Sequence, residues 1–155
     1  MEIHTWFECK IQHEKTIENG LTKVSTETYL VDALSFTEAE ARITEEMAPF
    51  VMGGFKVLGI KKANYSELFA MDDGTADKWF KGKLVFITLD EKSGKEKKQS
   101  TNILIHASDL PDALKKTQEG MEGTMGDYTI ASLSETPIMD VFPYEAPASK
   151  PEMEQ

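Results

Sequence analysis

The sequence predicts an α+β protein in which one strand-strand-helix-strand unit occurs twice in tandem. Long runs with alternating apolar residues indicate strands, and two shorter stripes of apolar residues at three- and four-residue spacing indicate helices. The two halves of the 155-residue chain also resemble each other. We therefore expect six mostly antiparallel strands with the two helices on one side. A continuous sheet and a half-barrel are both compatible with this pattern.

The internal similarity appears when the sequence is shifted against itself by about 73 positions. The stretch "WFECKI" (6–11) then falls on "WFKGKL" (79–84), and the rest of the pattern follows with few identities. Such a continuous but weak match is typical of an old tandem repeat. We interpret residues 1–70 as the first repeat and residues 75–143 as the second repeat of one domain, joined at "MDDG" (71–74).

The first repeat begins with a predicted hairpin. Residues 4–14 alternate in polarity, with Phe7, Cys9 and Ile11 on one face. The "ENG" that follows is typical of a turn, and a second strand is predicted at residues 21–33. Two neighbouring strands joined by such a short turn pair in antiparallel fashion.

A helix follows this hairpin. Ser35 with Glu38 has the spacing of a capping box, and Thr37 with Glu40 offers a second frame that starts the helix two residues later. The apolar stripe of this helix consists of Phe36, Ala39, Ile43 and Met47. Pro49 and the glycines after it are expected to end the helix.

The remaining strands follow the same order in both repeats. They are predicted at residues 55–69, 77–90, 97–107 and 126–142. A break is expected in the first of them near Ala63. Ser108 or Asp109 caps the second helix, where Pro111 in the first turn is harmless because the amide hydrogen it lacks has no partner there.

Composition and charge restrict the class of protein. The net charge of −10 opposes direct nucleic-acid binding, which depends on clustered Lys and Arg. No stretch reaches the ~20 apolar residues that a membrane helix requires. The single cysteine, Cys9, and a start without a secretory signal favour a cytoplasmic location. Residues 144–155 are rich in Pro, Glu and Ala, and we expect a flexible tail.

No established catalytic motif occurs in the chain, so we expect neither a catalytic residue nor a cofactor, and a non-enzymatic role is favoured. His4, His13 and His106 lack the spacing of metal ligands, and are interpreted as surface or strand-end residues without a bound metal. Cys9 is interpreted as a small buried thiol, because no partner base is evident. The acidic pairs at 45–46 and 72–73 are interpreted as ordinary helix and turn residues.

The aromatic pair in each repeat predicts a binding face. If Phe7 and Phe80 face the helices, alternation places Trp6 and Trp79 on the opposite side of the strands. The lysines predicted beside them are Lys10, Lys81 and Lys83. Such a face would stack a base or sugar, or anchor a protein partner. The alternative is that the tryptophans cover the second face of the sheet or form a homodimer seam.

Three stretches, "WFECK", "YLVDALSFTEAEARI" and "KKANYSELF", resemble a family of small proteins, the domain-of-unknown-function family 4494. The resemblance is strongest in the first half of the chain. It implies a setting in gut anaerobes and their prophage-like or conjugative elements, and an accessory role on a mobile element. It implies no activity and supplies no catalytic residue.

Our leading functional hypothesis is a non-enzymatic cytoplasmic interaction module, which binds a partner protein or a second copy of itself through the open sheet face. One alternative is a binder of a small, nucleotide-like ligand at the seam between the repeats. Another is an acidic mimic that blocks a nucleic-acid-binding protein. A hydrolase with an unrecognised site is the least favoured hypothesis.

Overall fold

Eight strands and two α-helices form the fold in the computed structural model, which describes residues 5–51, 54–70, 74–124 and 126–143. The strands are β1 (Thr5–Thr16), β2 (Thr22–Ala33), β3 (Phe55–Ala63), β4 (Glu67–Phe69), β5 (Lys78–Leu89), β6 (Glu96–Ala107), β7 (Asp127–Glu135) and β8 (Ile138–Phe142). The helices are α1 (Phe36–Met47) and α2 (Leu110–Gly120), and a single 3₁₀ turn, η1 (Glu18–Gly20), joins β1 to β2.

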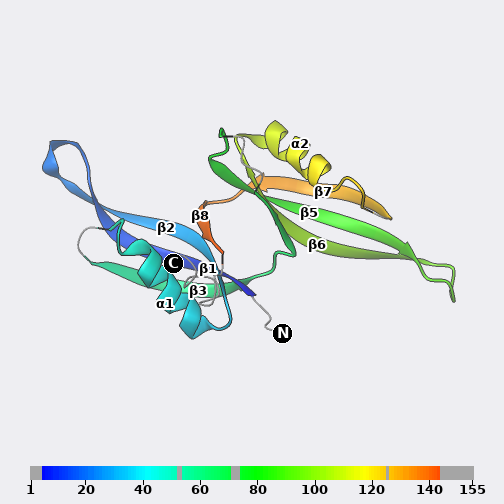
Figure 1. The fold of residues 1–155 in the computed structure, drawn as a ribbon, viewed down its shortest axis with the longest axis horizontal. Coiled ribbons are helices and arrows are strands. Elements are labelled where there is room, and N and C mark those ends of the chain that lie inside the picture. The colour runs from blue at the N-terminus through cyan, green and yellow to red at the C-terminus, as the bar shows by residue number, and fades with distance from the viewer. Residues whose placement is uncertain (1–4, 52–53, 71–73, 125, 144–155) are drawn as a thin grey trace, which may run out of the picture. The chain divides into compact units, whose positions relative to one another are not determined.

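The strands belong to two separate four-stranded sheets. Unit 1 consists of two segments of the chain, one up to Ala63 and one from Ile138, and its strand order is β3-β1-β2-β8. In unit 2, Asn64–Pro137, the order is β7-β5-β6-β4. Each unit has one helix against one face of its own sheet, as Figure 1 shows for α1 and α2. We call the opposite face of each sheet its outer face.

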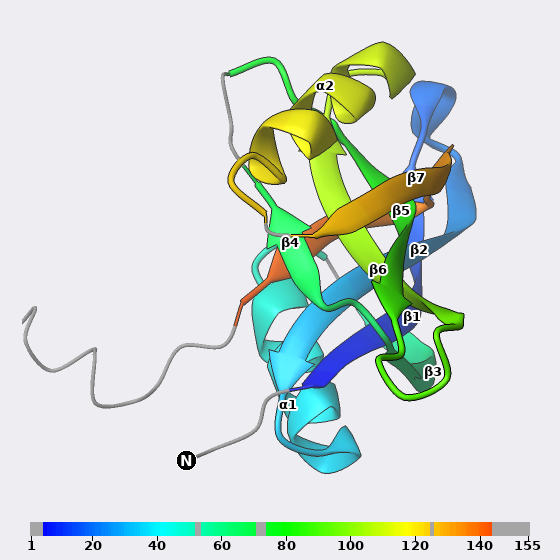
Figure 2. The ribbon, with the colours of Figure 1, turned by 90° about the vertical axis from the view of Figure 1, so that its right-hand side faces the viewer.

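The expected six strands are therefore corrected to eight in two sheets, and the expected layer with both helices on one side is corrected to one helix on each sheet. The number of strands differs because the last strand predicted in each repeat, at residues 55–69 and 126–142, is interrupted in the structure. We call these two the closing strands. The short pieces β4 and β8 leave the antiparallel pattern and pair in parallel with β6 and β2, respectively. Figure 2 shows β4 beside β6.

Polar residues at the two breaks satisfy the backbone where the strands end. At the first break, the Ser66 N–H and hydroxyl donate to the Asn102 carbonyl at 2.8 and 3.1 Å. At the second, the Thr136 N–H and hydroxyl donate to the Trp79 carbonyl at 2.9 and 2.8 Å. Pro137 has no N–H for a ladder, so β7 stops before it and β8 begins after it.

Both helices start at the expected capping residues. The Ser35 hydroxyl accepts a hydrogen bond from the Glu38 N–H at 3.1 Å, which selects the first of the two predicted frames. The Glu38 carboxylate in turn accepts from the Leu34 N–H at 2.7 Å. In α2 the cap is Asp109, whose carboxylate accepts from the Asp112 N–H at 2.9 Å.

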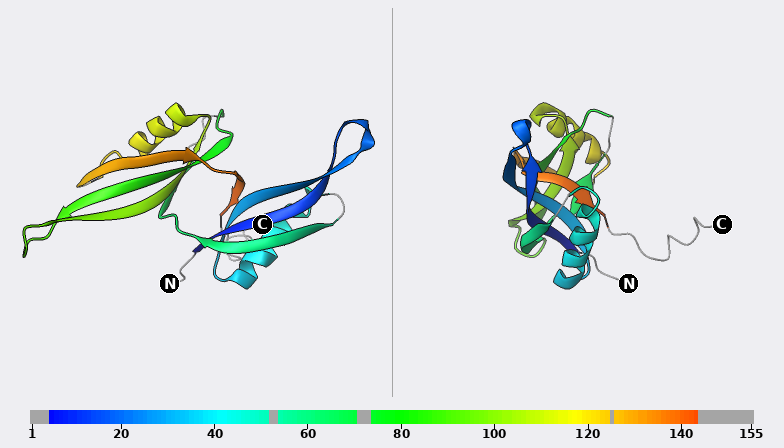
Figure 3. Two further views of the ribbon diagram at one scale, coloured as in Figure 1. Left: turned by 180° about the vertical axis from the view of Figure 1, so that it is seen from behind. Right: turned by 90° about the vertical axis from the view of Figure 1, so that its left-hand side faces the viewer.

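Each unit has its own apolar core between helix and sheet. In unit 1, Phe7, Cys9 and Ile11 are buried with Ala39 and Ile43, so the predicted alternation is confirmed there. In unit 2 the corresponding members from β5 are Phe80 and Leu84. Both hairpins, β1–β2 and β5–β6, are long and extend past the helices (Figure 3).

Some expectations fall on residues that the structure does not describe. These are the interrepeat residues 71–73, the tail at 144–155 and His4. The apolar stripe of α1 is confirmed for Ala39, Ile43 and Met47, whereas Phe36 is 48% exposed and meets Phe7 edge-on at 4.9 Å.

Candidate functional site

The residues that the sequence predicted for binding lie on the outer faces of the two sheets. Trp6 and Lys10 occupy the outer face of β1 in unit 1. Trp79, Lys81 and Lys83 occupy the equivalent face of β5 in unit 2. Alternation along each 12-residue strand explains this placement, because the intervening residues enter the two cores.

The two tryptophans differ in their surroundings. Trp79 is 6% exposed, and its ring stacks on the His106 ring with centroids 4.3 Å apart and an angle of 14°. Trp6 is half-buried. Little of the Trp79 ring is left for a ligand to stack on, so lysines are the exposed groups on the outer face of β5.

Exposed lysines lie on the outer face of one inner strand of each sheet, β1 in unit 1 and β5 in unit 2. Lys81 and Lys83 stand opposite Ser134 and Ser132 of β7, and Lys83 stands opposite Asn102 of β6. All three of Lys10, Lys81 and Lys83 are exposed. Unlike most of this acidic chain, the outer face of unit 2 therefore presents neighbouring positive charges among small polar side chains.

A depression of about 330 Å³ lies on the outer face of unit 1. The residues that line it are Glu8, Lys10, Thr28, Leu58, Gly59, Ile60 and Lys61. It lies at a β-bulge, where the register between β1 and β3 shifts after Lys10. Bulges bend a strand locally and are frequent beside binding sites.

A polar cluster that the sequence interpretation missed lies on the helix side of unit 1. The Glu27 carboxylate, whose side chain is 9% exposed, lies 2.8 Å from His13 Nε2, accepts a hydrogen bond from the Tyr29 hydroxyl at 3.0 Å, and lies 2.7 Å from Lys15 Nζ. The interpretation of His13 as a surface residue is wrong, since only 9% of it is exposed. Its alternation with Ile11 was the available signal.

The electrostatics of this cluster favour an ionised Glu27. Burial alone would raise the pKa of Glu27, but the hydrogen bonds from Lys15, His13 and Tyr29 and the charge of Lys15 outweigh it, so the pKa lies below its usual value. Burial, the hydrogen bond to Glu27 and nearby carboxylates raise the pKa of Tyr29, which therefore stays a neutral donor. The carboxylate has three donors around it, as a buried charge requires.

Unit 2 has apolar or uncharged residues at the equivalent positions. Phe86 occupies the ninth position of β5, as His13 does in β1. Thr101 pairs with Leu84 and Ile103 pairs with Gly82, as Glu27 and Tyr29 pair with Ile11 and Cys9. The fold therefore does not require the charged cluster, which distinguishes unit 1 from unit 2.

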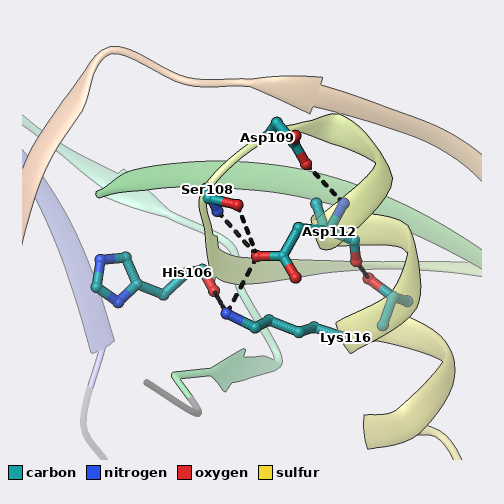
Figure 4. Close-up of polar contacts among 7 residues, drawn as sticks. His106, Ser108, Asp109, Asp112 and Lys116 are labelled. Carbon is teal, nitrogen blue, oxygen red and sulfur yellow. Dashed lines mark hydrogen bonds and ion pairs between the residues drawn. The ribbon is translucent and has the colours of Figure 1, made fainter. Parts of the chain in front are cut away.

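The start of α2 carries a second polar group, shown in Figure 4. The Asp112 carboxylate accepts from the Ser108 N–H and hydroxyl at 2.9 and 3.2 Å and lies 3.2 Å from Lys116 Nζ, and these contacts lower the pKa of Asp112. Lys116, 5% exposed, also donates to the His106 carbonyl at 3.3 Å. These contacts tie the helix to the end of β6, which is a structural role.

Cys9 is completely buried, as expected for a small core thiol. Burial, together with the charge of Glu8, raises the pKa of the thiol to about 12, so Cys9 is protonated and unreactive at neutral pH. Among the described residues, no three or more His, Cys, Asp or Glu side chains are arranged to hold a metal ion.

The helices in the described part of the chain are all too short or too polar to cross a membrane. No curated protein and no solved structure gives a significant match to the chain. A family model described as a domain of unknown function, DUF4494, matches residues 5–144. This match includes strands and helices of both units and therefore extends beyond the three stretches that carry the resemblance. The chain belongs to the DUF4494 family.

Proposed function

We propose that the protein is a non-enzymatic interaction module that binds a carboxylate-rich protein surface through the outer face of unit 2. The observation that carries this proposal is the exposed pair Lys81 and Lys83, which lies on an inner strand of a sheet whose helix covers the other face. A second copy of the chain is the first candidate partner, because its 27 Asp and Glu residues supply carboxylates with which Lys81 and Lys83 can pair.

The cellular setting is part of the same proposal. A cytoplasmic accessory role on a mobile element of gut anaerobes, which the family resemblance implies, is compatible with a small module that acts by binding. Neighbouring lysines on the outer sheet face also suit a protein partner, since opposite charges across an interface speed association and fix orientation.

Self-association through this face is testable by light scattering at low and high salt. We expect the wild-type mass to exceed that of one chain at low salt and to fall at high salt, because screening weakens contacts between exposed charges. The double variant Lys81→Glu with Lys83→Glu should dimerise at least about tenfold more weakly.

The matched control is Lys92→Glu with Lys95→Glu, which makes the same change of charge in the exposed β5–β6 turn. It should leave the mass unchanged. A wild-type mass of one chain at both salt concentrations, or an equal effect of the two double variants, would exclude self-association through Lys81 and Lys83. Trp6→Ala tests in the same assay whether unit 1 takes part.

A further inference from the structure

Two polar side chains in the depression of unit 1 lack a partner. Thr28 is 7% exposed, and its hydroxyl forms no hydrogen bond with any residue in the described ranges. Lys10 is exposed and forms no ion pair with a described residue. The Thr28 hydroxyl oxygen is not enclosed by the protein, so it is available to water or to a ligand in the depression. Both side chains line the same depression.

The register of the sheet brings these two groups together. Lys10 on β1 stands directly opposite Thr28 on β2 and opposite Gly59 on β3. Gly59 has no side chain, and a Cβ atom placed there would meet no atom within 4 Å. The missing side chain therefore leaves open space beside Lys10, next to the bulge that follows it.

The charges around the depression leave one net positive charge. Lys61 Nζ lies 3.5 Å from Glu8 Oε1, so these two side chains largely compensate each other. Lys10 is the remaining cation. Leu58, which is 49% exposed, adds an apolar wall. A small ligand with one anionic group and a short apolar part matches these groups.

Unit 2 provides an internal comparison at the same place. Lys83 on β5 also precedes a register shift, and stands opposite Asn102 and Ser132 as Lys10 stands opposite Thr28 and Gly59. The positions of Glu8 and Lys61 are taken by Lys81 and Ser134, which are opposite each other in register. The bulge is therefore shared by both sheets, whereas the glycine and the compensated ion pair occur in unit 1.

We propose that this depression binds a small ligand carrying an anionic carboxylate or phosphate group and a short apolar part. The anionic oxygens accept hydrogen bonds from the Lys10 ammonium and the Thr28 hydroxyl, and the apolar part contacts Leu58. This site goes beyond the proposed function: it uses unit 1, and it stands or fails independently of self-association through unit 2.

The test is a titration of ¹⁵N-labelled protein followed by amide chemical shifts. The probes are butyrate, butyl phosphate and inorganic phosphate, added separately through the millimolar range. We expect saturable shifts at and around Lys10, Thr28 and Gly59, with tighter binding of the two probes that carry an alkyl chain. Inorganic phosphate separates a general anion site from one that also uses the apolar wall.

Three variants and one control sharpen the test. Lys10→Gln should weaken binding about tenfold, since a charge-assisted hydrogen bond is lost. Thr28→Val replaces the hydroxyl with a methyl group and should weaken binding several-fold. Gly59→Val adds a side chain whose Cβ meets no atom within 4 Å, and this side chain should occupy the depression and abolish binding. Lys83→Gln, the matched change in unit 2, should leave the affinity unchanged.

Several outcomes would overturn the proposal. The absence of saturable shifts with all three probes would exclude the site. Equal losses in Lys10→Gln and Lys83→Gln would mean that the probes respond to general positive charge. Unchanged binding in Gly59→Val would place the ligand elsewhere, and equal affinity for inorganic phosphate and butyl phosphate would exclude the apolar contact. Folding of each variant is checked in the same amide spectra.

Discussion

At the scale of single residues, Glu27 is the clearest case of a charge held inside the fold. Its side chain is 9% exposed and has three donors around it, from His13, Lys15 and Tyr29. A buried charge of this kind is stable only while its partners are present, because removing one leaves the others without compensation. The equivalent positions of unit 2 avoid this dependence by having Phe86, Thr101 and Ile103.

The lowered pKa of Glu27 predicts how stability depends on pH. In the folded state the carboxylate is favoured more than in the unfolded chain, so its contribution is present above the unfolded pKa and disappears as the pH falls through the folded pKa. Glu27→Gln should lower the free energy of unfolding by about 2 kcal/mol at neutral pH. The difference from wild type should shrink as the pH falls from about 7 to about 3. Urea denaturation across this range measures it.

As a control, the charged cluster of unit 1 is replaced by the residues at the equivalent positions of unit 2. The triple variant His13→Phe, Glu27→Thr and Tyr29→Ile replaces the cluster with the residues of the equivalent positions, and should be more stable than Glu27→Thr alone, because no unpaired charge acceptor or donor is left inside. A difference between Glu27→Gln and wild type that stays constant with pH would contradict the role assigned to the carboxylate.

Alternation along a strand predicts on which face a residue lies, but not how far that residue is covered by other parts of the protein. The period of two correctly separated Phe7 and Phe80, which are buried, from Lys10 and Lys83, which are exposed. Alternation does not predict which residues of the outer face are buried, so the burial of Trp79 and its stacking on His106 could not be predicted. The site in the unit 1 depression also depends on Gly59, whose position opposite Lys10 requires the register with β3.

At the scale of elements, the sequence predicted two candidate cap residues for each helix, and one of the two is the cap in the structure. Capping is a local interaction among residues close in the chain, so the candidates were few. The choice between the Ser35 and Thr37 frames required the structure, in which the Ser35 hydroxyl accepts from the Glu38 N–H. The break near Ala63 in the first closing strand was expected, whereas the break between β7 and β8 was not, because strand pairing involves partners far along the chain.

The two capping frames differ in their expected effect on stability. Ser35→Ala should lower the free energy of unfolding by about 1 kcal/mol, because the Glu38 N–H loses its partner. Thr37→Ala, an exposed position inside the first turn, should change it by less than about 0.5 kcal/mol. Chemical denaturation of both variants measures the difference. A larger loss in Thr37→Ala would mean that the helix starts two residues later than described.

At the scale of the whole molecule, the second piece of each closing strand pairs in the other unit: β4 follows unit 1 in the chain but belongs to the sheet of unit 2. β8 follows unit 2 in the chain but pairs with β2 in unit 1, where Ile138 is buried and Phe142 stacks on Tyr29 at 5.8 Å. The Arg42 guanidinium also donates to the Pro143 carbonyl at 3.0 Å. Unit 1 is therefore completed by residues that follow the whole of unit 2 in sequence.

This connection predicts that a change in β8 affects unit 1 first. Phe142→Ala should destabilise unit 1 by about 2 kcal/mol, because it removes a partly buried ring that packs against the core of that unit. Hydrogen exchange should show faster exchange of the β1 and β2 amides and little change in β5 and β6. Equal acceleration in both sheets would indicate that the two units unfold as one. Met139→Ala, an exposed position on the same strand, is the control.

The sequence by itself predicted the two helices with two candidate caps each, the two long hairpins and the residues that share a face of each strand. These features depend on periodicity and on neighbours close in the chain, which are visible in the printed residues. The break near Ala63 was expected from the sequence as well. Only the tertiary structure decided that the second closing strand also breaks and that β4 and β8 pair in parallel in two sheets. It also decided that Glu27 contacts His13, Tyr29 and Lys15, and that Lys10, Thr28 and Gly59 line one depression. Each of these depends on register between distant segments, and register is set by packing of the whole unit rather than by any one stretch.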